Sequence, residues 1–190
     1  MKMNLQLFAL TTEQVENIQI DHGLVYANYG ETDEKKLGPT RGGGSFEVTK
    51  NLRDIEYDER KGKTKGVQVV DTIDAKLNVS HLDSSLATLA LAMPYAKYDA
   101  VAEEITCGND AIGVIPNTAY LKNITMFAKV IGGGYKKITL FNAMSEADFT
   151  LAAAPKAEGV MPLEVFAHWD AFDDTKLLYK IEDVDTIVTT

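Results

Sequence analysis

Apolar and polar residues alternate over a long stretch in the first half of the chain. From residue 67 to 79 the odd positions are nearly all apolar and the even positions nearly all polar, a period of two that is typical of a β-strand with one buried face. Asp71 breaks the apolar face and Val70 interrupts the polar one. A second strand is predicted at 45–57, and the charged, glycine-containing segment 58–66 joins the two strands into a long hairpin.

A second hairpin is predicted around three consecutive glycines. Strand-like segments at 120–131 and 135–142, rich in β-branched and aromatic residues, flank Gly132, Gly133 and Gly134, and glycine supplies the positive φ that a tight reversal requires. Further strands are predicted at 23–29, 163–169 and 176–181. About seven strands in one chain favour a β-sandwich or a barrel.

One α-helix is predicted directly after the long strand. Asp83 or Ser84 can accept hydrogen bonds from the first turn, and Pro94 ends the helix. Apolar residues recur at three- and four-residue spacing at Leu82, Leu86, Leu89, Ala90 and Met93. We expect this helix to lie across one end or face of the sheet, and we expect a second, shorter helix at 146–154.

The predicted fold is therefore mainly β, a sandwich or barrel of about seven strands with one flanking helix. A chain of 190 residues, 45% hydrophobic and 25% charged, predicts a single domain over 1–190. Three extensions are expected to lie outside its core: an N-terminal arm at 1–17, a long loop at 31–45 and the charged hairpin tip at 58–66. Loops of such length are usually functional or disordered.

The net charge of −9 argues against a general nucleic-acid binder, because affinity for phosphates comes from clustered Lys and Arg. The charge is uneven: basic residues gather between 35 and 65, and acidic residues dominate from 146 onward. These regions are either solvated loops or complementary patches that bring identical subunits together.

The chain is expected to be a soluble protein of a reducing compartment. The apolar run within residues 1–10 is short and interrupted, which does not fit a signal peptide. Nowhere is there a continuous apolar stretch long enough to span a membrane. Cys107 is the only cysteine, so no internal disulfide can form.

No arrangement of residues predicts catalysis, a metal or a cofactor. The glycine-rich segment 37–45 lacks the spacing of a phosphate-binding loop, and a strand follows it. The histidines His22, His81 and His168 lie in three separate elements, where each is expected at the surface or at a sheet edge. Paired acids such as Asp173 and Asp174 are interpreted as solvated. We therefore expect a non-enzymatic protein.

The layout of the sequence resembles that of siphophage major tail proteins. The resemblance covers nearly the whole chain and rests on these segments: MNLQLFA at 3–9, LGPTRGGGSF at 37–46, RDIEYD at 53–58, the strand ending LNV at 77–79, the capped helix from Asp83, AKVIGGG at 128–134 and LLYKI at 177–181.

The resemblance implies a structural virion protein located in the tail and made in the host cytoplasm. Subunits of this family have a small β-sandwich with a flanking helix and form hexameric rings whose sheets join around a channel. The rings stack through an N-terminal arm and a long hairpin or loop. Tape measure and terminator proteins are the implied partners, and DNA passes through the channel without specific binding.

Two sets of residues follow as hypotheses. The channel lining is expected from the polar faces of the two hairpins, namely Glu47, Asp74, Asn78, Asn123 and Thr125. Contacts between rings are expected to join Arg60, Lys61, Lys63 and Lys65 to an acidic patch that includes Asp173, Asp174, Asp183 or Asp185.

Four other interpretations remain open. A tail terminator or head–tail connector also forms rings of small β proteins, and the tube of a contractile tail or secretion machine would share the fold. A ligand-binding β-sandwich, such as a carbohydrate module, usually exposes a planar row of aromatic residues, whereas this chain has one tryptophan, Trp169. An enzyme would place Cys107 at its centre.

Overall fold

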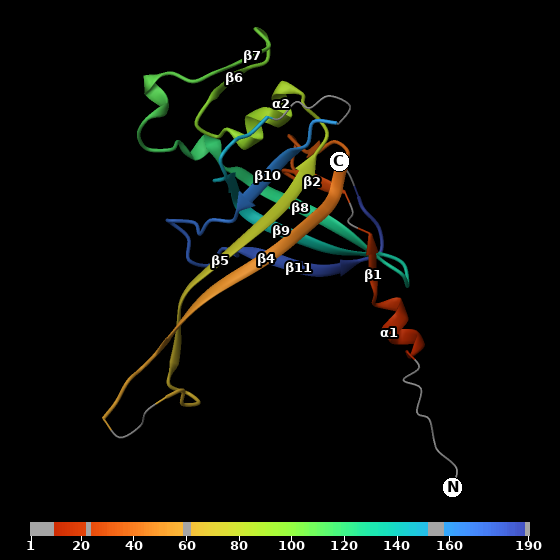
Figure 1. The fold of residues 1–190 in the computed structure, drawn as a ribbon, viewed down its shortest axis with the longest axis vertical. Coiled ribbons are helices and arrows are strands. Elements are labelled where there is room, and N and C mark those ends of the chain that lie inside the picture. Colours follow the sequence, from red (N-terminus) through yellow and green to blue (C-terminus); the bar gives the residue numbers. More distant parts are fainter. Residues whose placement is uncertain (1–9, 22–23, 59–61, 152–157, 189–190) are drawn as a thin grey trace.

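The computed structural model describes residues 10–21, 24–58, 62–151 and 158–188. Antiparallel strands dominate this part of the chain, which confirms the predicted mainly β fold (Figure 1). The strands are β1 (Gln19–Asp21), β2 (Val25–Ala27), β3 (Lys35–Lys36), β4 (Thr40–Asp54), β5 (Gln68–His81), β6 (Lys97–Asp99), β7 (Glu104–Thr106), β8 (Leu121–Val130), β9 (Tyr135–Ser145), β10 (Met161–Phe166) and β11 (Tyr179–Val184).

Strand β9 connects two layers of the main sheet. Its first half pairs with β11, whereas Met144 and Ser145 at its end pair with β10. The strand order through the described residues is β3–β2–β8–β9–β10–β5–β4, with β1 added beside β8. One continuous sheet therefore contributes both sides of the core, and β6 with β7 forms a separate small hairpin.

The core consists of alternate residues from strands of both layers. Leu77 of β5 and Val165 of β10 are opposite each other in the register and almost completely buried. They share one apolar cluster with Ile124 of β8 and Leu140 of β9, which come from the other layer. The period of two in the sequence is thus the pattern of a strand that buries one face.

The glycine turn between β8 and β9 confirms the second predicted hairpin. Gly133 and Gly134 have φ of +99° and +75°, a region that other residues rarely adopt. Gly132 allows a close approach by the helix α1 (Thr12–Glu16), since its N–H donates to the Glu16 carbonyl at 2.9 Å. This helix, which was not predicted, lies within the proposed N-terminal arm.

The predicted helix after β5 is present but short. It consists of α2 (Leu86–Leu89) and the 3-10 turn η1 (Ala90–Ala92). The carboxylate of Asp83 accepts hydrogen bonds from the Ser85 N–H at 2.9 Å and from the Thr88 hydroxyl at 2.8 Å, and these bonds lower the pKa of Asp83. The second predicted helix is wrong: residues 146–151 are not helical, and 152–154 lie outside the described residues.

Two further expectations need correction. The segment 31–45 is not a loop throughout, because β3 and the start of β4 lie in it and Leu37 is buried in the core. The Leu37 N–H donates to the Val25 carbonyl at 2.9 Å, which holds this segment against β2. His81 was expected at the surface or a sheet edge, yet it is fully buried and neither ring nitrogen has a hydrogen-bond partner among the described residues. His22 lies outside the described residues.

Candidate functional site

The hairpin of β4 and β5 projects well beyond the rest of the sheet (Figure 1). We call its outer part, residues 47–58 and 62–74, the ribbon. The two strands pair continuously from Val48 with Ala75 to Asp54 with Gln68, apart from one irregularity. Residues 47–58 and 68–72 are all exposed. Because a hairpin of two strands is only marginally stable in water, the ribbon is a surface that a partner would stabilise.

A β-bulge decides which residues share a face of the ribbon. Asn51 pairs with Thr72, but Leu52 pairs with Val70, so Asp71 is the extra residue. Leu52 and Val70 therefore lie on the face that carries the buried core residues nearer the body. Val48, on the same face, is 38% exposed, and Leu52 and Val70 are 45% and 49% exposed. These three residues form an apolar stripe that continues the core outward, interrupted by Lys50, which pairs with Ile73 on the same face.

The opposite face is polar and carries ion pairs. Lys76 Nζ lies 2.9 Å from Glu164 Oε1 and 3.4 Å from Glu47 Oε2, and the hydrogen bond to Glu164 raises the pKa of Lys76. Among the predicted channel residues, Glu47 and Asp74 are exposed and Asn78 is partly buried. The register places these three residues on one side of the sheet, and their role in a channel stays a prediction.

The other two predicted channel residues, Asn123 and Thr125, are buried. Asn123 Oδ1 accepts hydrogen bonds from the Tyr29 N–H at 2.9 Å and from the Thr125 hydroxyl at 3.2 Å, and Asn123 Nδ2 donates to the Tyr29 carbonyl at 3.1 Å. The rings of Tyr29 and Phe127 pack edge to face beside them. Side chains buried in this way cannot face a channel, so β8 does not support the predicted lining.

We call residues 55–58 and 62–67 the ribbon tip. Its basic residues are available for contact. Lys63 and Lys65 are exposed, and neither takes part in an ion pair within the described part of the chain. Arg60 and Lys61, predicted to act with them, lie outside the described residues. The inter-ring contact of this basic group stays a prediction.

The predicted acidic partners have local interactions of their own. Asp183 pairs with Lys136 at 2.5 Å. Asp173 accepts hydrogen bonds from the Thr175 hydroxyl at 2.6 Å and the Thr175 N–H at 3.0 Å, which lower the pKa of Asp173. The remaining two, Asp174 and Asp185, are exposed. Two of the four predicted acidic residues, Asp173 and Asp183, therefore already have a local partner.

Strand β4 is an open edge of the sheet. It ends the strand order, so within the described residues only one of its sides is paired. A glycine bulge at Gly42 and Gly43, with φ of +79° and +88°, interrupts the pairing near its start, and the register continues from Gly44. An edge of this length presents unpaired N–H and C=O groups that another strand can bind.

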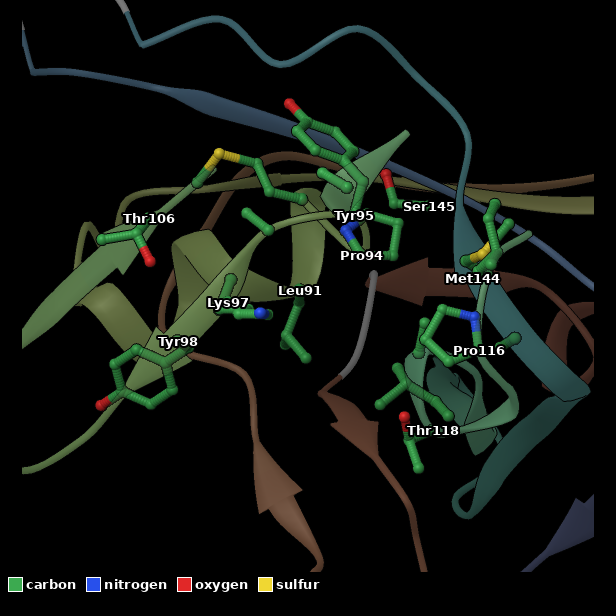
Figure 2. Close-up of a pocket in the computed structure, with 18 of the residues that line it drawn as sticks. Leu91, Pro94, Tyr95, Lys97, Tyr98, Thr106, Pro116, Thr118, Met144 and Ser145 are labelled. Atoms are coloured by element: carbon green, nitrogen blue, oxygen red, sulfur yellow. The ribbon is translucent and has the colours of Figure 1, made fainter. Parts of the chain in front are cut away.

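Residues 94–118, which we call the extension, lie at the opposite end of the molecule from the ribbon tip (Figure 1). A cavity of about 490 Å³ lies beneath it. The floor is formed by the buried residues Ala143, Leu163 and Val165. In Figure 2, Lys97, Tyr98 and Thr106 line one side and Pro116, Thr118 and Met144 the other, with Leu91 between them.

The extension was not predicted from the sequence, because its apolar residues recur neither at every second position, as in a strand, nor at every third or fourth, as in a helix. The available signal was a cluster of apolar residues among glycine and proline without periodicity. Large apolar side chains are strongly exposed there, at Val101 (96%), Ile112 (85%) and Val114 (99%). Strong exposure of several large apolar side chains in one segment is a feature of interaction surfaces.

The described residues offer little for catalysis or metal binding. His168 Nε2 lies 2.7 Å from Glu146 Oε1 and its Nδ1 lies 2.9 Å from the Asn142 carbonyl oxygen, an arrangement that fixes the ring at the end of β10. Cys107 is exposed. Within the described ranges, no three His, Cys, Asp or Glu residues are grouped to hold a metal ion, and no helix has the length and hydrophobicity to cross a membrane.

Comparison with known proteins gives distant matches. No family model and no curated protein matches the chain. A chain in the cryo-EM structure of the anti-feeding prophage (AFP) baseplate, 6-fold symmetrised, is 10% identical, with 78% of this chain and 90% of that chain covered and a TM-score of 0.49. A chain in the virion of the native gene transfer agent (GTA) particle is 9% identical, with 93% and 99% covered and a TM-score of 0.42. Likeness at these values establishes neither family nor function.

Proposed function

We propose that this chain is a structural subunit of a phage particle that assembles with copies of itself into a tail tube. The observation that carries the proposal is the ribbon, whose apolar stripe and polar face are both exposed although the stripe continues the core. In a lone subunit these apolar side chains stay in contact with water, whereas a second copy would bury them. The resemblance of the sequence layout to siphophage major tail proteins supports the finer assignment to hexameric rings stacked as a conduit for DNA.

Two kinds of interface would build such a tube. The open edge of β4 suits sheet joining between neighbours within a ring, where each free N–H and C=O gains a partner. The ribbon suits contact between rings, because it reaches beyond the body. A contact between different surfaces of identical subunits closes into a ring or continues as an open stack, depending on the rotation it imposes.

The charge of the chain fits a channel through which DNA slides. Six copies with a net charge of −9 would surround the channel with negative charge, which repels the phosphate backbone. Glu47 and Asp74 lie on the polar face of β4 and β5, where Lys76 is already paired with Glu47 and Glu164. Tape measure and terminator proteins are the expected partners, in the tail of a virion made in the host cytoplasm.

Negative-stain electron microscopy of the purified full chain at high concentration tests this function. Hollow cylinders are the expected result. Isolated rings would favour a tail terminator or connector instead, and monomers at every concentration would contradict self-assembly. Charge reversal at Arg60, Lys61, Lys63 and Lys65 should leave soluble monomers, whereas the control Lys129→Glu, an exposed lysine on β8, should assemble normally.

A further inference from the structure

We propose that the ribbon tip of one copy docks in the cavity beneath the extension of a second copy. The inference rests on the proposed function, since it names the two surfaces that join successive subunits. It also replaces the acidic patch around Asp173 and Asp174 as the partner of the basic tip.

The two surfaces lie at opposite ends of the molecule. On the cavity floor, Val165 pairs with Leu77 of β5, whereas the ribbon tip begins beyond Gln68 at the other end of the same strand. Extended strand rises about 3.3 Å per residue, so roughly 30 Å separates the floor from the start of the tip. A copy cannot bend this strand to reach its own cavity. Contact between the two surfaces must join separate copies head to tail, which gives an open stack.

Apolar groups are available on both sides of the contact. Ile55 and Tyr57, at the tip end of β4, are 48% and 43% exposed. The cavity has an apolar floor, and Val114 at its margin is 99% exposed. Burying an aromatic and an aliphatic side chain in a preformed apolar cavity is the usual form of an interface anchor.

The charges of the two surfaces are opposite. Lys63 and Lys65 lie exposed in the segment that joins β4 to β5, and Glu103 and Glu104 lie exposed in the extension. Within the described residues none of these four has an ion-pair partner, whereas the other charges of the extension are engaged: Lys97 pairs with Asp110, and Asp99 accepts the backbone N–H groups of Val101 and Ala102. These exposed carboxylates belong to the same small hairpin as Lys97, Tyr98 and Thr106, which line the cavity, and their charge is opposite to that of the tip.

The position of the only cysteine provides a direct test. Cys107 is exposed in the extension, directly after β7. In the variant Lys63→Cys, a disulfide between residue 63 of one copy and Cys107 of the next requires their Cα atoms to approach within about 7 Å. Mild oxidation of assembled protein should then give a ladder of covalent oligomers on a non-reducing gel.

Matched variants separate this pairing from the others. Two controls should give no ladder. One is the wild type, which has only Cys107, and the other is Lys63→Cys combined with Cys107→Ser. Asp174→Cys combined with Lys63→Cys and Cys107→Ser reports on the rival acidic patch. A ladder from this triple variant, with none from Lys63→Cys, would overturn the inference while leaving the proposed function intact. Absence of any assembly in the wild type would overturn both.

Charge exchange gives a second readout. Lys63→Glu with Lys65→Glu, and separately Glu103→Lys with Glu104→Lys, should each raise the concentration for half-assembly by roughly tenfold or more. Combining all four substitutions should restore most of the loss, because the attraction is re-formed with its signs exchanged. Failure of the combined variant to recover, with Asp173→Lys and Asp174→Lys blocking assembly instead, would contradict the docking site.

Discussion

The apolar stripe of the ribbon permits a perturbation that separates assembly from folding. In the double variant Leu52→Thr and Val70→Thr, both residues keep a strand-forming side chain but lose apolar character. Both positions are about half exposed in the monomer, at 45% and 49%. Because about half of each side chain is already covered in the monomer, the free energy of unfolding of the monomer should fall by at most about 1 kcal/mol per site.

Assembly should respond much more strongly. Full burial of a Val or Leu side chain contributes about 1.5–3 kcal/mol, and roughly half of this area remains to be buried by a partner. Each residue would then contribute about 1 kcal/mol to the contact, so the double variant loses about 2 kcal/mol. This corresponds to a rise of roughly 30-fold in the concentration for half-assembly. Sedimentation across a concentration series measures this shift, and thermal unfolding of dilute monomer measures the stability.

Two controls make the result decisive. Val69→Thr replaces a methyl group with a hydroxyl on the same strand, but Val69 pairs with Arg53 on the polar face, so assembly should be unchanged. Leu77→Ala empties a fully buried core position and should destabilise the monomer by about 2–5 kcal/mol. The reasoning is refuted if the double variant assembles like the wild type, or if it destabilises the monomer as much as Leu77→Ala does.

Three further outcomes are expected. Burial lowers the pKa of His81, so the unfolded state binds more protons than the folded state below about pH 6.5. The free energy of unfolding should therefore fall as the pH drops from 7 to 5, by at most about 1.4 kcal/mol per pH unit, and denaturant titrations of His81→Leu should show a weaker dependence on pH. Asn123→Ala leaves the N–H and carbonyl of Tyr29 unpaired and should cost about 2–4 kcal/mol in urea unfolding. Gly134→Ala should cost more than Gly133→Ala by calorimetry, because both have positive φ but only at Gly134 would the added Cβ lie 2.8 Å from the Val184 carbonyl oxygen.

The strand pattern was readable from the sequence, and one irregularity in it carried information. Asp71 and Val70 appear exchanged between the faces of the predicted strand, and the structure explains both residues by a single bulge opposite Asn51 and Leu52. Alternation predicts faces only while the register is unbroken. The sequence could not show where the break lies, because the extra residue is defined by pairing with a distant strand.

Burial of polar positions was the main failure of the sequence interpretation. Asn123 and Thr125 alternate with apolar residues, as an exposed strand face would, yet they are covered by the region of Tyr29, whose hydroxyl donates to the Val188 carbonyl at 2.6 Å. The second face of β8 is covered because two segments 159 positions apart in the sequence come into contact, which no local pattern can show. Leu37 was likewise assigned to a loop, because its partners in the core are remote in the sequence.

Hydrogen–deuterium exchange of the free and the assembled protein tests the central claim that copies of the chain cover the ribbon. Backbone amides of residues 48–54 and 68–74 should exchange quickly in the monomer wherever the hairpin frays, and much more slowly after assembly. Amides of the core strand β8 should be protected in both states. Assemblies that form while the ribbon amides keep the exchange rates of the monomer would contradict the account.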